Sequence, residues 1–144
     1  MTIFAGSKPR DLGITSAGRL RDCPSSPNCV CSDDARSSHR VDAFALALPP
    51  AEAWAALREA VAALPRTRVV SDHGDYLHAE CRSPLLGFVD DLELHLRRDA
   101  GVVAVRSASR VGYSDLGVNR RRVDDLRAAL VQRGAVQDEA ARAR

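Results

Sequence analysis

The chain has 144 residues, of which 45% are hydrophobic and 28% are charged, a composition typical of one globular domain with a buried core. Its net charge of +2 is too small to indicate nucleic acid as a partner, and 4% of aromatic residues is too few for a base-stacking platform. The sequence has no stretch of about 20 apolar residues and no run of signal-peptide type. We therefore expect a small soluble domain in the cytoplasm, without a membrane span.

The predicted elements follow in the order strand, helix, four strands and helix. Residues 1–40 are rich in Gly, Pro, Ser and Asp and predict an irregular arm. Apolar residues alternate with other residues over 40–48, which predicts a first strand. Two prolines follow, and the helical spacing of apolar residues over 51–64 then predicts a helix. Strand-like stretches follow at 67–71, 76–83, 89–96 and 102–109. Amphipathic spacing over 119–133 predicts the second helix, before a charged tail at 135–144 that we expect to fray.

Short turns between the later strands favour antiparallel pairing. One face of the resulting sheet has to be covered, and the two helices are the only predicted elements able to cover it. We therefore predict an α+β fold for residues 41–134, with an antiparallel sheet of four to five strands, two helices packed on one face and an irregular N-terminal arm.

The predicted hairpin of the last two strands places acidic and polar side chains opposite each other. A tight turn between these strands pairs Glu93 with Arg106 and Asp90 with Ser109. Side chains alternate along a strand, so Asp90 and its neighbour Asp91 point to opposite faces. They therefore cannot flank one bond as the two carboxylates of a glycosidase do.

The stretch "RSASRVGYSDLGVNRRRV" carries the main candidate site, at residues 106–120. It passes from a strand into a helix, and it combines glycines and hydroxyls with arginines near the free N–H groups of the helix start. We predict that it binds an anionic small molecule or an acidic group of a partner protein, with Arg106 and Arg110 as bidentate clamps. The predicted ligand-binding residues are Arg106, Ser107, Ser109, Arg110, Tyr113, Asn119 and Arg120, and the predicted orienting residues are Asp90, Asp91 and Asp115.

A structural alternative explains the same residues without a ligand. In it, Asp115 caps the helix, Arg106 pairs with Glu93, and the arginines of the helix point to solvent. Two functional alternatives also remain open. One is an enzyme in which Asp90 or Cys29 reacts beside the arginines, and the other is a structural adaptor that binds a protein partner.

The segment "CPSSPNCVC" holds three of the four cysteines. In a reducing cytosol we expect thiols rather than a disulfide framework, and Cys23 and Cys29 form a candidate thiol site. The alternative is that these cysteines are small apolar groups buried under a proline-rich arm. The spacing is not that of a CxxC knuckle, so it does not predict a zinc site.

His78 and His95 fall on the polar face of the predicted sheet. With Glu80 or Glu93 they could bind a metal ion, but we prefer the interpretation of a solvated polar face. We therefore predict no metal and no cofactor.

Three separated blocks resemble, in order, a family of bacterial and plastid proteins catalogued as domain of unknown function 1499. Residues 8–32 resemble its arm, with the motif Cys-x-x-Ser-Pro-Asn-Cys-Val, residues 76–94 its central strands, and residues 105–123 its signature. The family has no settled activity, so the resemblance implies little about chemistry, and Cys31 departs from the pattern, where serine is usual. The positions that the resemblance marks as signature positions are Ser26, Pro27, Asn28, Cys29, Phe88, Asp90, Asp91, Arg106, Ser107, Ser109, Arg110, Gly112, Tyr113, Asp115, Gly117, Asn119 and Arg120.

Overall fold

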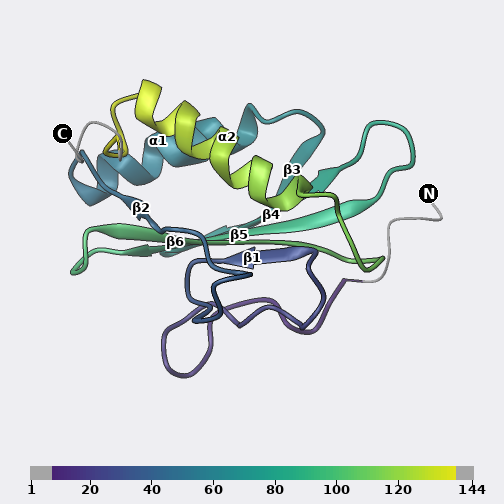
Figure 1. The fold of residues 1–144 in the computed structure, drawn as a ribbon. Coiled ribbons are helices and arrows are strands. Elements are labelled where there is room, and N and C mark those ends of the chain that lie inside the picture. Colours follow the sequence, from purple (N-terminus) through teal and green to yellow (C-terminus); the bar gives the residue numbers. More distant parts are fainter. Residues whose placement is uncertain (1–7, 139–144) are drawn as a thin grey trace.

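The computed structural model describes residues 8–138, with a sheet that carries two helices on one face and the N-terminal arm on the other (Figure 1). The strands are β1 (Cys29–Cys31), β2 (Phe44–Ala45), β3 (Thr67–His73), β4 (Tyr76–Arg82), β5 (Val89–Arg97) and β6 (Val102–Ser109), and the helices are α1 (Pro50–Ala62) and α2 (Val118–Gln132). The sheet is antiparallel and has the order β1-β6-β5-β4-β3, with β2 also paired to β6. The predicted α+β class is confirmed, and β1, from the arm, brings the sheet to six strands.

The helix face of the sheet holds the apolar core. The stripe Trp54, Leu57 and Val61 on α1 and the stripe Val123, Leu126 and Leu130 on α2 are buried against alternate residues of the strands. Removing one such leucine from water stabilises the fold by roughly 1.5–3 kcal/mol, so these stripes are the main reason why both helices lie on this face.

The register of β5 and β6 matches the predicted hairpin. Glu93 lies opposite Arg106, and Asp90 lies opposite Ser109. Gly101 closes the turn with φ 66°, in the left-handed region that glycine adopts without a steric penalty. The turn therefore fixes which side chains of the two strands face each other.

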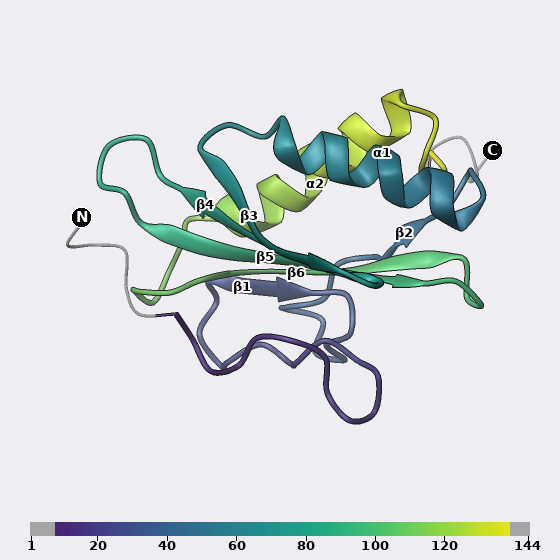
Figure 2. The same cartoon turned by 180° about the vertical axis from the view of Figure 1, so that it is seen from behind.

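The arm covers the second face of the sheet (Figure 2). Leu20 and Cys23 pack on Ala104 and Ala108 of β6, whose small side chains leave room for the arm. This face was expected to be solvated, and that expectation is wrong. Its charged and polar side chains are buried, including His78, Glu80, Asp91, Glu93 and Arg106.

The ends of the domain also differ from the expected boundaries. Ala135 and Val136 are buried, and Val136 forms a bridge with Leu46, so the ordered chain continues past residue 134. The remainder of the expected tail, residues 139–144, lies outside the described residues, as does the start of the arm, residues 1–7. Within the described part of the chain, neither helix is long and apolar enough to cross a membrane.

Candidate functional site

Arg110 directly follows β6, and carboxylates of the same chain bind its side chain on the arm side of the sheet. Its Nε and Nη2 atoms each donate to Asp91 at 2.8 Å, and Nη2 also donates to Glu80 at 2.6 Å. His78 Nε2 lies 2.7 Å from Asp91 Oδ1. Burial raises the pKa of Asp91, but the hydrogen bonds from Arg110 and His78 outweigh it and hold that pKa below its ordinary value. The guanidinium of Arg110 is therefore already neutralised.

Arg106 is similarly occupied by acidic groups. Its Nη2 atom donates to Asp11 Oδ2 at 2.8 Å, and its Nη1 atom lies 3.6 Å from Glu93 Oε1. The other oxygen of Glu93 accepts from the Tyr76 hydroxyl at 2.5 Å and from the Gly13 N–H at 2.7 Å. Burial raises the pKa of Glu93, and these donors offset only part of the shift. The pairing of Arg106 with Glu93 is the one that the structural alternative predicted.

The predicted hydroxyls and Asn119 come together on the opposite side of the sheet. Ser107 Oγ donates to Asn119 Oδ1 at 2.7 Å, and Asn119 Nδ2 donates to Ser109 Oγ at 2.9 Å and to Asp115 Oδ2 at 2.8 Å. Asp115 also accepts from the Asn119 backbone N–H at 2.9 Å, near the start of α2. Because side chains alternate along β6, Arg106 and Arg110 point to the face opposite Ser107 and Ser109. The arginines and the hydroxyls therefore cannot bind one ligand together.

Arg122 supplies the arginine of this polar cluster. Its Nη1 atom donates to Asn119 Oδ1 at 2.9 Å and to Ser107 Oγ at 3.2 Å, and its Nη2 atom lies 2.8 Å from Asp90 Oδ2. Sequence reasoning missed Arg122, although its spacing of three residues from Asn119 places both on one side of a helix. The Asp90–Ser109 pair at the end of the core thus receives its positive partner from α2.

The other predicted ligand residues lie apart from this cluster. Arg120 donates to the backbone oxygens of Ser38 at 3.2 Å and Arg40 at 3.3 Å, which ties the segment after β1 to α2. Tyr113 lies on the loop before α2 with 72% of its surface exposed. The structure therefore brings together the two serines, Asn119, Asp90 and Asp115, and separates them from the predicted arginines.

The candidate thiol site is a disulfide, which corrects the expectation of free thiols. Cys23 and Cys29 are joined, and Cys31 and Cys81 are free and buried. Burial raises the pKa of Cys31 to about 11, so this thiol stays protonated at neutral pH. In the described part of the chain, no group of three or more His, Cys, Asp or Glu side chains is arranged to hold a metal ion.

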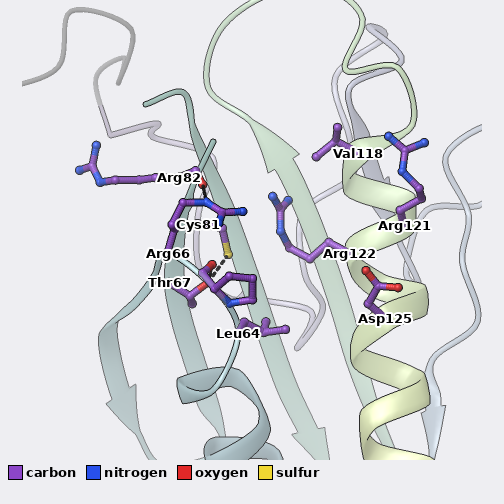
Figure 3. A pocket seen from close by; sticks show the side chains of 10 residues that line it. Leu64, Arg66, Thr67, Cys81, Arg82, Val118, Arg121, Arg122 and Asp125 are labelled. Atoms are coloured by element: carbon purple, nitrogen blue, oxygen red, sulfur yellow. Dashed lines mark hydrogen bonds between the residues drawn. The ribbon is translucent and has the colours of Figure 1, made fainter. Parts of the chain in front are cut away.

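A second set of arginines gathers on the helix side, in a hollow of about 200 Å³ between the start of α2 and the nearby ends of β3 and β4. The charged residues that line this hollow are Arg66, Arg82, Arg121, Arg122 and Asp125. We call the hollow the arginine groove. Figure 3 shows Arg66 and Arg122 directing their guanidinium groups toward each other from opposite sides, while Arg82 extends away from α2.

The arginines of this groove differ in whether a carboxylate neutralises their charge. Within residues 8–138, no carboxylate forms an ion pair with Arg66 or Arg121. Arg66 Nε donates to the Arg82 backbone oxygen at 3.0 Å, and Arg121 Nη1 donates to the Leu116 backbone oxygen at 3.0 Å. Arg122 is balanced by the carboxylate of Asp90, 2.8 Å away. The groove therefore carries positive charge that its own carboxylates do not fully neutralise. Sequence reasoning missed it because Arg66 and α2 are distant in the chain and meet only in the fold.

The sequence model of a family described as protein of unknown function, DUF1499, matches residues 19–130. The match spans the disulfide, the whole sheet, α1 and all of α2 except its last two residues. No curated protein matches the chain, and no solved structure matches it either.

Proposed function

Because the chain belongs to the DUF1499 family, whose function is unknown, we infer its role from geometry and propose that it is a binding domain that holds an anionic group in the arginine groove. The observation that carries the proposal is the convergence of Arg66 and Arg122 across the groove, together with the lack of a carboxylate partner for Arg66 and Arg121 among the described residues (Figure 3). The anionic group belongs to a small molecule, such as a phosphate or a carboxylate.

Electrostatics favour an anion at this place. Guanidinium groups that face each other repel, and a negative group between them replaces repulsion with attraction. A guanidinium also offers paired N–H donors that match the oxygens of a phosphate or carboxylate. Arg66 is partly pre-oriented by its bond to the Arg82 backbone, which lowers the conformational entropy lost on binding.

The backbone of Arg66 supports the same conclusion. Arg66 has φ 51°, and together with Leu116, at φ 54°, it is one of two non-glycine residues with positive φ in residues 8–138. This region is sparsely populated for residues with a side chain, and such conformations concentrate at functional sites. Both residues border the surface around the start of α2, where the proposed site lies.

The proposal moves the predicted anion site from one set of arginines to another. Arg106 and Arg110 are bound by carboxylates of their own chain, whereas Arg66 and Arg121 are not. Of the two reactive groups in the enzyme alternative, Cys29 is part of the disulfide, and Asp90 is paired with Arg122.

Calorimetric titration with inorganic phosphate tests the proposal. We expect saturable binding to the wild type, a loss of at least tenfold in affinity in Arg66→Ala, and a smaller loss in Arg121→Ala, whose guanidinium points away from Arg66 and Arg122 (Figure 3). Arg21→Ala is the matched control, since it removes an exposed arginine of the arm that lies outside the groove. Equal affinities in the wild type and in both groove variants, or equal losses in all three variants, would contradict a specific site.

The disulfide between Cys23 and Cys29 bears on the cellular compartment of the protein. The sequence alone favours the cytoplasm, whereas disulfides form and persist in oxidising compartments. Because this bond joins the arm to β1, we propose that the folded protein works where Cys23–Cys29 stays oxidised. Rapid acid quenching of cells, denaturation and thiol alkylation should label two cysteines, and the labelling of four would support the cytoplasm instead.

A further inference from the structure

An apolar hollow of about 550 Å³ lies beside the arginine groove, on the other side of the first residue of α2. Phe88, Val89, Val111 and Leu116 contribute its apolar wall, and Val118 lines both the hollow and the groove. Its volume is within the range of small-molecule sites. One ligand could therefore reach both sites at once.

The polar side chains of the hollow are already hydrogen-bonded within the protein. Asp90 binds Arg122, and Ser109 accepts from Asn119 at 2.9 Å. The remaining pairs are Ser83 with the Phe88 N–H at 2.9 Å, Ser114 with the Leu116 N–H at 3.2 Å, and Asp115 with the Gly117 N–H at 2.9 Å. An occupant of the hollow therefore needs no polar groups of its own.

Exposed apolar side chains concentrate around the same hollow. They lie on the β4–β5 loop, on the β6–α2 loop and at the first residue of α2, and Figure 1 shows both loops at one end of the molecule. They are Leu85, Leu86, Val111, Tyr113, Leu116 and Val118, and Val69 is the one other large apolar side chain of residues 8–138 that is exposed. Such a concentration marks an interaction site rather than ordinary surface.

We propose that the apolar hollow binds the alkyl chain of an anionic amphiphile whose charged head lies in the arginine groove, an inference that rests on the proposed function. A peptide fits these observations less well, because its backbone N–H and C=O groups lose hydrogen bonds to water when buried, and the apolar side chains of the wall, Phe88, Val89, Val111 and Leu116, give none in return. An alkyl chain has no such groups, and the arginines balance the charge of the head.

Titration with decyl phosphate, kept below its micelle-forming concentration, tests the inference against inorganic phosphate. Each methylene removed from water tightens binding about fourfold, so four buried methylenes give roughly a 250-fold gain. We therefore expect monomeric decyl phosphate to bind about 250-fold more tightly than phosphate. Equal affinities, with phosphate binding still dependent on Arg66, would overturn this inference and leave the proposed function standing.

Two leucine variants locate the alkyl chain. Leu116→Asn places an uncharged polar group on the wall of the hollow, at an exposed position whose positive φ asparagine tolerates. Leu85→Asn is the matched control, because Leu85 is 94% exposed and lies outside the hollow. We expect Leu116→Asn to weaken decyl phosphate at least tenfold without changing the affinity for phosphate, and Leu85→Asn to change neither. Equal losses in both variants would overturn a chain bound in the hollow.

Sedimentation with vesicles separates a monomeric ligand from a lipid surface. With vesicles of phosphatidylcholine and phosphatidylglycerol, we expect less binding to the vesicles once monomeric decyl phosphate fills the hollow. Vesicle binding that requires Leu85 as much as Leu116, without binding of the monomer, would overturn the inference in favour of insertion of both loops. Tight decyl phosphate binding that Arg66→Ala and Arg121→Ala leave unchanged would contradict the proposed function as well, since the head would then lie elsewhere.

Discussion

The helix face and the arm face of the sheet are both covered by other segments of the chain, but they are buried by opposite means. On the helix face, alternate residues of β4, β5 and β6 such as Leu77, Leu94 and Val105 meet the apolar stripes of α1 and α2. On the arm face, many of the intervening residues are charged, and pairs such as Arg110 with Asp91 lie under the arm. The same strands therefore carry an apolar core on one side and an ionic network on the other.

This difference separates what stabilises the fold from what positions the arm. Apolar burial is roughly proportional to area and needs no fixed geometry. A buried ion pair adds little net stability, because desolvation of both charges offsets their attraction, but removing one partner leaves an uncompensated charge. The arm makes such directional contacts, for example between Asp33 and Arg97, whose Nη1 donates at 2.7 Å. We therefore assign stability mainly to the helix face and the placement of the arm mainly to the arm face.

The largest expected effect comes from breaking the arm-face network at its centre. Arg110→Met removes the cation that the buried carboxylates of Asp91 and Glu80 share, and we expect the free energy of unfolding to fall by about 3–5 kcal/mol in urea denaturation. The double variant Arg110→Met/Asp91→Leu should recover part of this loss, because it removes the stranded charge. A loss in the single variant below about 1 kcal/mol would show that water solvates this face.

A leucine variant on the helix face sharpens the contrast. Leu126→Ala opens a cavity under α2, where Leu126 is fully buried, and we expect the free energy of unfolding to fall by about 3 kcal/mol. Because no charge is involved, the loss should be the same at pH 4 and pH 7. A loss that changes strongly between these pH values would mean that the two faces are coupled and cannot be treated separately.

The sequence predicts the helix face well because its signals are local. Helical spacing identifies the stripe of α1, and a tight hairpin fixes the register of Asp90 opposite Ser109. β1 was missed because three residues within a proline-rich segment carry no period, and β1 forms only by pairing with β6. Part of the polar cluster was predicted, because Ser107, Ser109 and Asn119 lie close together in sequence. Arg122, the arginine that completes the cluster, was not predicted.

The arm face could not be predicted because alternation shows which residues point outward, not what covers them. His78 and Glu93 have the pattern of a solvated face, and the arm that buries them ends at residue 40, which is 38 residues before His78. The arginine groove could not be predicted from the sequence for a related reason. Arg66 lies between two elements in the chain, and only tertiary packing places it opposite α2.

Loss of the disulfide should have an intermediate effect on the arm face. Cys23 and Cys29 are six residues apart, so their bond closes a short loop and restricts the unfolded chain modestly. We expect Cys23→Ala/Cys29→Ala to lower the free energy of unfolding by about 2 kcal/mol, and reduction of the wild type to have a similar effect. Hydrogen exchange should then increase in the arm before it increases in α2. Equal increases in both would contradict a separate role for the arm.

The smallest expected effect is a pH dependence of opposite sign at two glutamates of the arm face. Burial raises the pKa of Glu93 above its unfolded value of about 4.3. Such a group stabilises the fold fully below its unfolded pKa, and this contribution is lost as the pH rises through the folded pKa. Glu93→Gln removes this loss, so its free energy of unfolding should rise relative to the wild type between about pH 4 and pH 7.

Glu80 is the matched control, because its partners outweigh the effect of burial on its pKa, whereas the partners of Glu93 do not. Burial raises the pKa of Glu80, but hydrogen bonds from Arg110 and Arg68 outweigh it, so the folded pKa lies below the ordinary value. Its stabilisation is therefore present above about pH 4 and lost as the pH falls through the folded pKa. Glu80→Gln should lose stability relative to the wild type as the pH rises from 3 to 7, opposite to Glu93→Gln. Slopes of the same sign in urea titrations would mean that the network titrates as one unit, and that the partners of each carboxylate do not set its pKa separately.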